Sequence, residues 1–389
     1  VGVGEYKEQG FRYVSPHTFE ALRCTEVSPS DVLICRLADP VGRACLAPDL
    51  GIPMITSVDV CILKPGEHVH PGFVTYLLSS AQYLGYMESQ CRGGTRDRVS
   101  RSFLGAVRVS IPSPDEQTAI AAFLDRETAK IDALIAEQQR LIELLQEKRQ
   151  AVISHAVTKG LNPDAPMKDS GIEWLGEVPE HWEVVPFSTA VAFQEGPGIM
   201  AADFHEDGVP LLRLSGAQGR WATLDGCNYL DPNKVAKRWE HFRLNVGDLL
   251  ISGSASMGTV CEIGPDTAGS VPYTGLIRLV CKGQSICRDF LRHVVVSSMF
   301  VTQIEHLRAG ATIQHFGPTH LRAVKIALPP SKEHQLICDY LDCALRQADS
   351  LIESATFAIT LLQERRSALI SAAVTGQIDV RGLAGSEAA

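Results

Sequence analysis

The sequence lacks a long apolar run, paired cysteines and an excess of basic residues. No stretch reaches the roughly 20 apolar residues of a membrane-spanning helix, and the first residues do not read as a secretory signal. Eleven cysteines are scattered without CxxC spacing, which is typical of reduced thiols in a cytoplasmic protein. The formal net charge of −9 argues against a protein that grips nucleic-acid phosphates by charge alone.

The chain also lacks the motifs of the enzymes that act on DNA. It has no Asn/Asp-Pro-Pro-aromatic loop, no glycine-rich cofactor loop after a strand, no Walker loop and no nuclease metal triad. His68 and His70 are spaced as a possible metal pair, but without further ligands we read them as surface residues. We therefore expect a non-catalytic chain with no metal site.

What the chain does contain is a long repeat. The stretch 107–158 recurs 217 positions later without a gap, and 21 of its 52 positions are identical. A repeat of this length decides the architecture before any single residue does.

Each copy of the repeat contains one long amphipathic helix. Ser113 and Glu116 fit a capping box at the start of the first. Apolar residues then recur every seven positions in two rows, as in a helix pair with a shared seam. The rows begin at Leu124 and Thr128 in one helix and at Leu341 and Leu345 in the other. We expect the two helices to be antiparallel, because each globular part precedes its own helix.

The regions before the helices are two related globular parts. Strands are predicted at 31–35, 58–63 and 107–111 in the first, and at 248–252 and 324–328 in the second. A helix is predicted at 71–91 and its counterpart at 288–308. The predicted domains are 1–112, 113–158, 159–183 (a linker), 184–329, 330–375 and 376–389 (a loose tail). The first globular part lacks about 30 residues of the second, so we expect an N-terminally truncated chain.

These motifs resemble the specificity (S) subunit of Type I restriction-modification enzymes. The junction Ile111-Pro112 with Glu116 is repeated as Leu328-Pro329 with Glu333. The segment 169–182, DSGIEWLGEVPEHW, is similar to the opening of many target recognition domains in that family. Two divergent globular parts alternate with two similar helices, and the resemblance covers essentially the whole chain.

The resemblance implies an α+β fold. Two α/β target recognition domains are separated by two long antiparallel coiled-coil helices, with pseudo-two-fold symmetry. It also implies a bipartite double-stranded DNA site, two methyltransferase (M) subunits on the paired helices, and restriction (R) subunits that complete the enzyme. S-adenosylmethionine, ATP and Mg would belong to those other subunits, and this chain needs no cofactor of its own.

Most candidate DNA-contacting residues lie in matched loops of the two globular parts, and Lys234, Lys237 and Arg238 form a separate basic group expected to meet phosphate. Arginine forks fit guanine edges and phosphates, and glutamine fits adenine. The alternative for each residue is an ordinary exposed polar side chain. The candidates are Arg36, Arg92, Arg96, Arg98 and Arg101 in the first part, and Lys234, Lys237, Arg238, Ser252, Ser254, Ser256, Arg308, Thr312, Gln314, His315 and His320 in the second.

Four charged helix residues repeat between the copies: Glu147 and Arg149, with Glu364 and Arg366. They are candidates for docking partner subunits, with pairing within or between the helices as the alternative. Two other functions remain open for the whole chain. One is a coiled-coil protein-interaction scaffold, and the other is a defective S subunit with only one functional DNA-reading domain.

Overall fold

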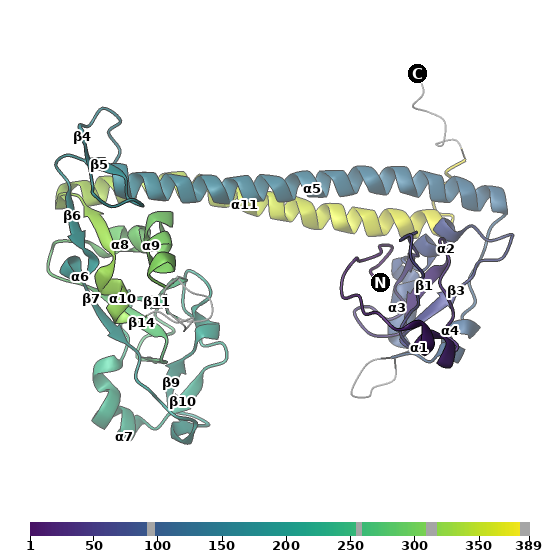
Figure 1. Ribbon diagram of the computed structural model, residues 1–389, viewed down its shortest axis with the longest axis horizontal. Coiled ribbons are helices and arrows are strands. Elements are labelled where there is room, and N and C mark those ends of the chain that lie inside the picture. The colour runs from purple at the N-terminus through teal and green to yellow at the C-terminus, as the bar shows by residue number, and fades with distance from the viewer. Residues whose placement is uncertain (92–97, 254–258, 309–316, 382–389) are drawn as a thin grey trace. The chain divides into compact units, whose positions relative to one another are not determined.

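The computed structural model describes residues 1–91, 98–253, 259–308 and 317–381. The chain divides into two compact units. Unit 1 comprises Val1–Leu141 and Ser354–Ala389, and unit 2 comprises Ile142–Glu353. Both combine small sheets, whose strands are mostly antiparallel, with helices (Figure 1). The predicted α+β fold is confirmed.

Two long helices, α5 (Pro114–Lys159) and α11 (Ser331–Val374), contribute to both units. The capping box at the start of α5 forms as predicted: Glu116 N–H donates to Ser113 Oγ at 3.4 Å, and Ser113 N–H donates to Glu116 Oε2 at 3.3 Å. These bonds satisfy backbone donors that the first turn of a helix leaves open.

The helices are antiparallel, because each unit combines the start of one with the end of the other. In unit 1, Ile120 and Leu124 of α5 share an apolar cluster with Ile370 of α11. In unit 2, Ile153 of α5 shares one with Leu341 of α11. The seam rows begin as predicted, since Leu124, Thr128, Leu341 and Leu345 are all buried.

The central sheets of the two units correspond under the 217-residue shift. In unit 1, β1 (Val32–Cys35) lies between β2 (Ala44–Leu46) and β3 (Val60–Leu63). In unit 2, β11 (Leu249–Ser252) lies between β12 (Val260–Glu262) and β14 (Leu276–Cys281). All these pairs are antiparallel. Unit 2 has a further strand, β7 (Val191–Glu195), on the outer edge of β14.

The helix predicted at 71–91 is two helices, α2 (Pro71–Leu77) and α3 (Ala81–Ser89), and 288–308 likewise forms α8 (Arg288–Val296) and α9 (Ser298–Arg308). The prediction of a single continuous helix was therefore wrong in both copies. The cause is the serine at each break: the Ser80 and Ser297 hydroxyls accept from backbone N–H groups three residues on and so start a new helix.

The second helix of each pair is fixed to a long helix by the same hydrogen bond. Ser298 N–H donates to Ser154 Oγ at 2.9 Å in unit 2, and Ala81 N–H donates to Ser371 Oγ at 3.0 Å in unit 1. The two donors are 217 residues apart, and so are the two acceptors. The repeat therefore preserves individual hydrogen bonds between globule and helix.

The strand predicted at 107–111 does not form, although its counterpart β15 (Lys325–Leu328) does. In unit 2, β15 pairs with β6 (Glu183–Pro186). Among the described residues no strand pairs with 107–111, so this segment has no ladder hydrogen bonds and is irregular. A short helix missed from the sequence precedes each segment, α4 (Arg101–Ala106) and α10 (Pro318–Ala323).

The predicted linker is more ordered than a tether. It forms a hairpin from β4 (Met167–Asp169) and β5 (Glu177–Pro179). It ends at Trp182, which is fully buried and whose indole N–H donates to Glu333 Oε2 at 3.0 Å. The tryptophan thus ties the linker to the start of α11.

In unit 1, the remaining helix α1 (Pro16–Ala21) buries none of its residues.

The rest of unit 2 is a second sheet with short helices. The sheet has the order β13-β9-β10-β8. Its strands and the remaining short elements are β8 (Phe204–His205), β9 (Val209–Leu212), β10 (Asn228–Leu230), β13 (Val271–Pro272), α6 (Phe187–Ala190), α7 (Pro232–Lys234), η1 (Ala201–Asp203), η2 (Leu214–Ala217), η3 (Val235–Trp239) and η4 (Glu240–Phe242).

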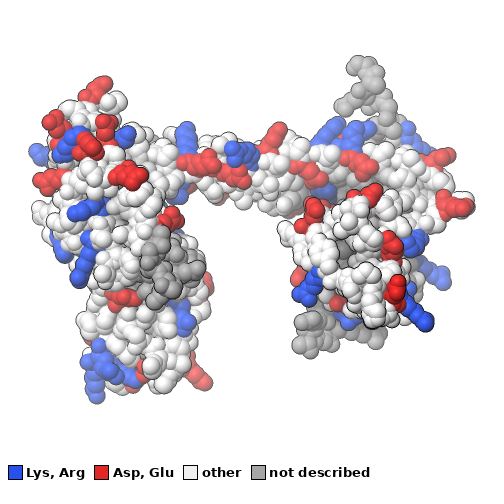
Figure 2. Space-filling view, in the orientation of Figure 1, with Lys and Arg blue, Asp and Glu red and all other residues white. Residues whose placement is uncertain are grey.

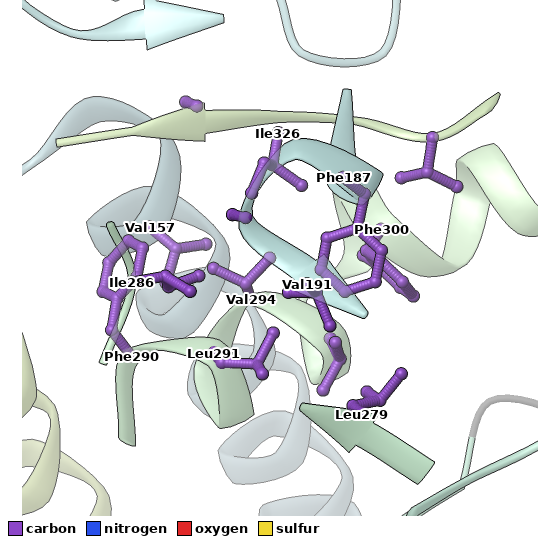
Figure 3. Packing of buried hydrophobic residues seen from close by; sticks show 14 of the residues in the cluster. Val157, Phe187, Val191, Leu279, Ile286, Phe290, Leu291, Val294, Phe300 and Ile326 are labelled. Carbon is purple, nitrogen blue, oxygen red and sulfur yellow. The ribbon is translucent and has the colours of Figure 1, made fainter. Parts of the chain in front are cut away.

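The main core of unit 2 joins the sheet, the helices and the segment that carries β6 and β7 (Figure 3). Phe187 packs edge-on against Phe300, with ring centroids 5.0 Å apart. Ile326 of β15 and Leu279 of β14 belong to the same cluster. Each fully buried side chain of this size stabilises the fold by about 1.5–3 kcal/mol.

Candidate nucleic-acid interface

Three basic side chains line one groove of unit 1. Arg36 follows β1, Lys64 follows β3, and Arg101 begins α4; all three border a groove of about 490 Å³. Lys64 also forms a 2.7 Å ion pair with Asp31, which lies just before β1. Because β1 and β3 are antiparallel, Arg36 lies opposite Asp59 at one end of the strand pair and Lys64 lies beside Asp31 at the other. Such a groove is suited to an anionic ligand.

Arg36 and Arg98 converge on one carboxylate. Arg98 Nη2 lies 3.1 Å from Asp59 Oδ1, and Arg36 Nη2 lies 3.7 Å from the same oxygen. Arg36 also donates to the Val58 carbonyl, and its side chain is only 11% exposed, against 46% for Arg98. Arg98 and Arg101 are therefore the more accessible pair, whereas Arg36 mainly holds the loop in place.

In unit 2, a basic turn surrounds Trp239. Lys234 and Arg238 lie over its indole, with the charged groups 5.6 and 5.8 Å from the ring centroid. Lys234 also pairs with Asp203, and this hydrogen bond lowers the pKa of the Asp203 carboxyl. Lys237 and Arg238 are exposed. Figure 2 shows lysine and arginine side chains gathered at the end of this unit that carries α7.

Two predicted contact residues have structural roles instead. Ser252 at the end of β11 is 1% exposed, so its hydroxyl is not presented to a ligand. His320 Nδ1 accepts from the Gly317 N–H at 3.2 Å, at the start of α10. Other predicted contacts lie outside the described residues: Arg92, Arg96, Ser254, Ser256, Thr312, Gln314, His315 and the side chain of Arg308.

Of the four charged residues that repeat between the long helices, the two arginines form ion pairs and the two glutamates are exposed. Arg366 forms a bidentate pair with Asp132 in unit 1, at 2.8 and 3.2 Å. Its counterpart Arg149 pairs with Asp349 in unit 2, at 3.2 Å. Asp132 and Asp349 are themselves 217 residues apart, so the same ion pair forms twice. The arginines thus link α5 to α11, while Glu147 and Glu364 lie exposed.

Large apolar side chains also lie exposed at matched positions of the two helices. Leu134 and its counterpart Leu351 are 45% and 54% exposed, and Leu144 and its counterpart Leu361 are 45% and 48% exposed. A single exposed leucine is ordinary, but matched exposure in both copies marks a surface suited to a partner.

Comparison with known proteins shows which proteins this chain resembles. Residues 30–145 match the family described as the Type I restriction modification DNA specificity domain. The Type I restriction enzyme MjaVIII specificity subunit of Methanocaldococcus jannaschii is 24% identical over 305 residues, covering 77% of this chain and 68% of that protein. The EcoKI specificity subunit of Escherichia coli K12 is 26% identical over 212 residues, covering 52% and 44%. The chain is thus similar to Type I restriction enzyme specificity subunits.

A solved structure has a similar fold. A chain from a study of complex assembly and conformational transition in the type I R-M system superposes with a TM-score of 0.70 at 17% identity. The match covers 91% of this chain and 84% of that one. The family resemblance and the α+β fold with two long helices are thus both confirmed.

Two surface features were missed from the sequence. Lys64 lines the basic groove, but its place there, beside Asp31 and at the other end of the strand pair from Arg36, depends on the pairing of β3 with β1. Trp221 is 50% exposed, with the Arg220 guanidinium 5.6 Å from its ring centroid. An exposed tryptophan next to an arginine is a signal that could have been read from the sequence.

Two kinds of feature are missing from the described part of the chain. None of its helices is long and apolar enough to cross a membrane. Its His, Cys, Asp and Glu side chains form no group of three that could hold a metal ion.

Proposed function

We propose that the chain is a non-catalytic DNA-specificity subunit whose two globular parts each read one half of a bipartite site. The observation that carries this is a repeated frame with different polar surfaces. The matched strands and helices hold a basic groove in unit 1, with Arg98 and Arg101 exposed beside it, and a basic turn around Trp239 in unit 2. When two globular parts share the same strands and helices but present different polar side chains, each can contact a different half-site.

The net charge of −9 fits this function if partner subunits supply the general attraction for phosphates. The globular parts would then contribute base contacts and positioning. Specific binding in the assembled complex, with weak binding by the isolated chain, is the expected behaviour. Strong, salt-resistant DNA binding by the isolated chain would contradict this division of roles.

The experiment that tests the function is co-expression of the chain with its cognate methyltransferase subunit, followed by methylome sequencing. The expected result is a methylated motif with two specified halves and an unspecified gap. A motif with a single specified half favours the defective-subunit alternative, and no new methylation favours the scaffold. S-adenosylmethionine, ATP and Mg enter this proposal only as cofactors of the methyltransferase and restriction subunits.

We further propose that the exposed leucines on the long helices dock the methyltransferase subunits. Leu134 and Leu361 lie in unit 1, and Leu144 and Leu351 lie in unit 2, so each unit presents one leucine from each helix. An apolar contact in both units suits two copies of one partner. The exposed Glu147 and Glu364 could add polar contacts at the edges of these surfaces.

Paired substitutions test the docking surface. Leu134→Glu with Leu351→Glu should reduce co-purification of the methyltransferase at least tenfold, because each change buries a charge in an apolar contact. The matched control is Gln146→Glu with Gln363→Glu, which adds the same charges at exposed positions of the same helices. Circular dichroism checks that all variants remain helical. Equal co-purification by both variants would remove the leucines from the interface.

A further inference from the structure

Unit 2 contains a cleft of about 420 Å³ that is bordered by both long helices. Its other walls come from α8, from β11 and β12, and from the segment 218–220 that follows η2. All of its lining residues belong to unit 2 and lie outside the basic turn around Trp239. A volume of this size is usual for small-ligand sites. Four of the lining residues are arginines: Arg149, Arg220, Arg292 and Arg346.

Two of the four arginines are already paired with acids of the cleft. Arg149 Nε lies 3.2 Å from Asp349 Oδ1, and Arg292 Nη2 lies 3.6 Å from Asp342 Oδ1. The third acidic lining residue, Glu262, lies 3.3 Å from an arginine of α8 that does not line the cleft. Each carboxylate that borders the cleft is therefore engaged by a cation.

The other two arginines, Arg220 and Arg346, have no ion-pair partner among the described residues. Arg346 Nε donates to the Asp342 carbonyl at 2.9 Å, a bond within its own helix that supplies no negative charge. The Arg220 guanidinium lies 5.6 Å from the centroid of the Trp221 ring, and an aromatic face does not neutralise it. Both arginines are exposed. Two guanidinium charges therefore border the cleft without a carboxylate.

A buried histidine gives independent evidence of positive charge in the cleft. His293 lines the cleft, is 1% exposed, and its Nε2 lies 3.4 Å from Arg292 Nη2. Burial lowers the pKa of His293 most, and the charges of three arginines of the cleft lower it further, while Asp289 opposes them. Because three guanidinium groups act on one neutral ring, the local field favours an anion.

The equivalent place in unit 1 is built differently. Tyr76, the counterpart of His293, donates to Asp125 Oδ1 at 2.7 Å. Two of the cleft's arginines have uncharged counterparts there, Thr75 and Ala129. The frame that the two units share therefore does not require these positive charges, and they call for a separate explanation in unit 2.

We propose that this cleft binds a phosphate-bearing ligand through Arg220 and Arg346. Two guanidinium groups without carboxylate partners match a ligand that carries two or more negative charges. Phosphoryl oxygens accept hydrogen bonds from an arginine fork in pairs, and these charge-assisted bonds are stronger than neutral ones. A single carboxylate would neutralise only one of the two arginines.

Two sources supply this chemistry: the backbone of duplex DNA and a free phosphorylated molecule such as a nucleotide. Both present phosphoryl oxygens to the same two arginines. The site does not depend on the reading of DNA bases proposed above, because its binding can be measured on the chain without DNA.

The test uses the full chain and inorganic pyrophosphate. Isothermal titration calorimetry should show saturable binding, and the melting temperature should rise with pyrophosphate concentration. Arg220→Ala with Arg346→Ala should weaken this binding by roughly tenfold or more, because both charge-assisted contacts are lost. The fold should remain intact, since both side chains are exposed. The matched control is Arg322→Ala with Lys332→Ala, which removes two positive charges from exposed positions of unit 2 outside the cleft.

DNA binding by the assembled complex separates the two sources. If the ligand is the DNA backbone, the Arg220→Ala and Arg346→Ala variant should bind DNA more weakly and with a smaller salt slope. If the ligand is a free phosphorylated molecule, the variant should bind DNA as the wild type does while pyrophosphate binding is lost. Loss of pyrophosphate binding in the cleft variant alone supports the site in both cases. No pyrophosphate binding by the folded wild-type chain, or equal losses in the cleft and control variants, would overturn the proposal and leave the methylome test of DNA reading unaffected.

Discussion

At the scale of single residues, two buried histidines should make the protein sensitive to acid. Burial, assisted by Arg292, lowers the pKa of His293 to about 3. Burial also lowers the pKa of His334, whose ring stacks on Phe290. His293 is therefore neutral in the folded chain at pH 5, and the lowered pKa of His334 favours its neutral form as well. Unfolding exposes both histidines, which then take up protons below their ordinary pKa of about 6.5. Stability is therefore lost as the pH falls below that value.

His293 alone should remove about 2 kcal/mol of unfolding free energy between pH 7 and pH 5. Denaturant titrations at several pH values measure this loss. His334→Gln is the matched variant, because the corresponding residue Gln117 is buried with three hydrogen bonds, to His68, His70 and Pro112. The variant should lose less stability on acidification than the wild type. An equal loss in both would show that His334 takes up its proton while folded.

The basic groove of unit 1 gives a second prediction. In the assembled complex, Arg98→Ala and Arg101→Ala should each weaken DNA binding, and the salt dependence should decrease by about one unit of slope for each phosphate that is no longer neutralised. Lys7→Ala is the control, since Lys7 is an exposed lysine of the same unit outside the groove. Unchanged binding and slope in both arginine variants would move the interface away from this groove.

Residue roles were harder to predict from the sequence than residue types. Arg149 and Arg366 were candidates for docking, and pairing between the helices was left open. Only the antiparallel register shows that each faces an aspartate of the other helix. Ser252 looked like a loop residue, but the strand ladder carries it into the core. The roles of these residues depend on which side chains lie close to them in the folded chain, and a single sequence does not show that.

At the scale of elements, the repeated ion pair should support helix pairing twice. Reversing one charge, as in Asp132→Arg, places two cations together and should cost about 0.5–1 kcal/mol at low salt. Adding Arg366→Asp to that variant restores opposite charges and should recover most of the loss. A double-mutant cycle by chemical denaturation measures the coupling. Additive effects of the two changes would mean that the pair is not formed in solution.

The elements themselves were largely predictable. The long helices followed from the seven-residue apolar rows, and the central strands from their β-branched composition. The failures had local causes. Serines at the two helix breaks were overlooked as caps, and the strand at 107–111 was predicted without asking which strand would pair with it. A strand without a partner gains no ladder hydrogen bonds, however favourable its composition.

At the scale of the whole molecule, the repeat supplies the organising principle. One frame is used twice, with the same serine hydrogen bonds, the same ion pairs and the same capped breaks. The surface groups differ between the two copies. The repeat could be read from sequence alone, and so could the resemblance to Type I specificity subunits. What each globular part recognises could not be read, because loop chemistry does not fix how a loop meets its target.

The most direct test of two independent readers is a domain exchange. Residues 184–329 would be replaced by the equivalent region of another specificity subunit with a known motif, and the methylome of the co-expressed complex sequenced. The account predicts that one half of the methylated motif changes to that of the donor while the other half and the gap stay the same. A change in both halves, or in neither, would contradict it.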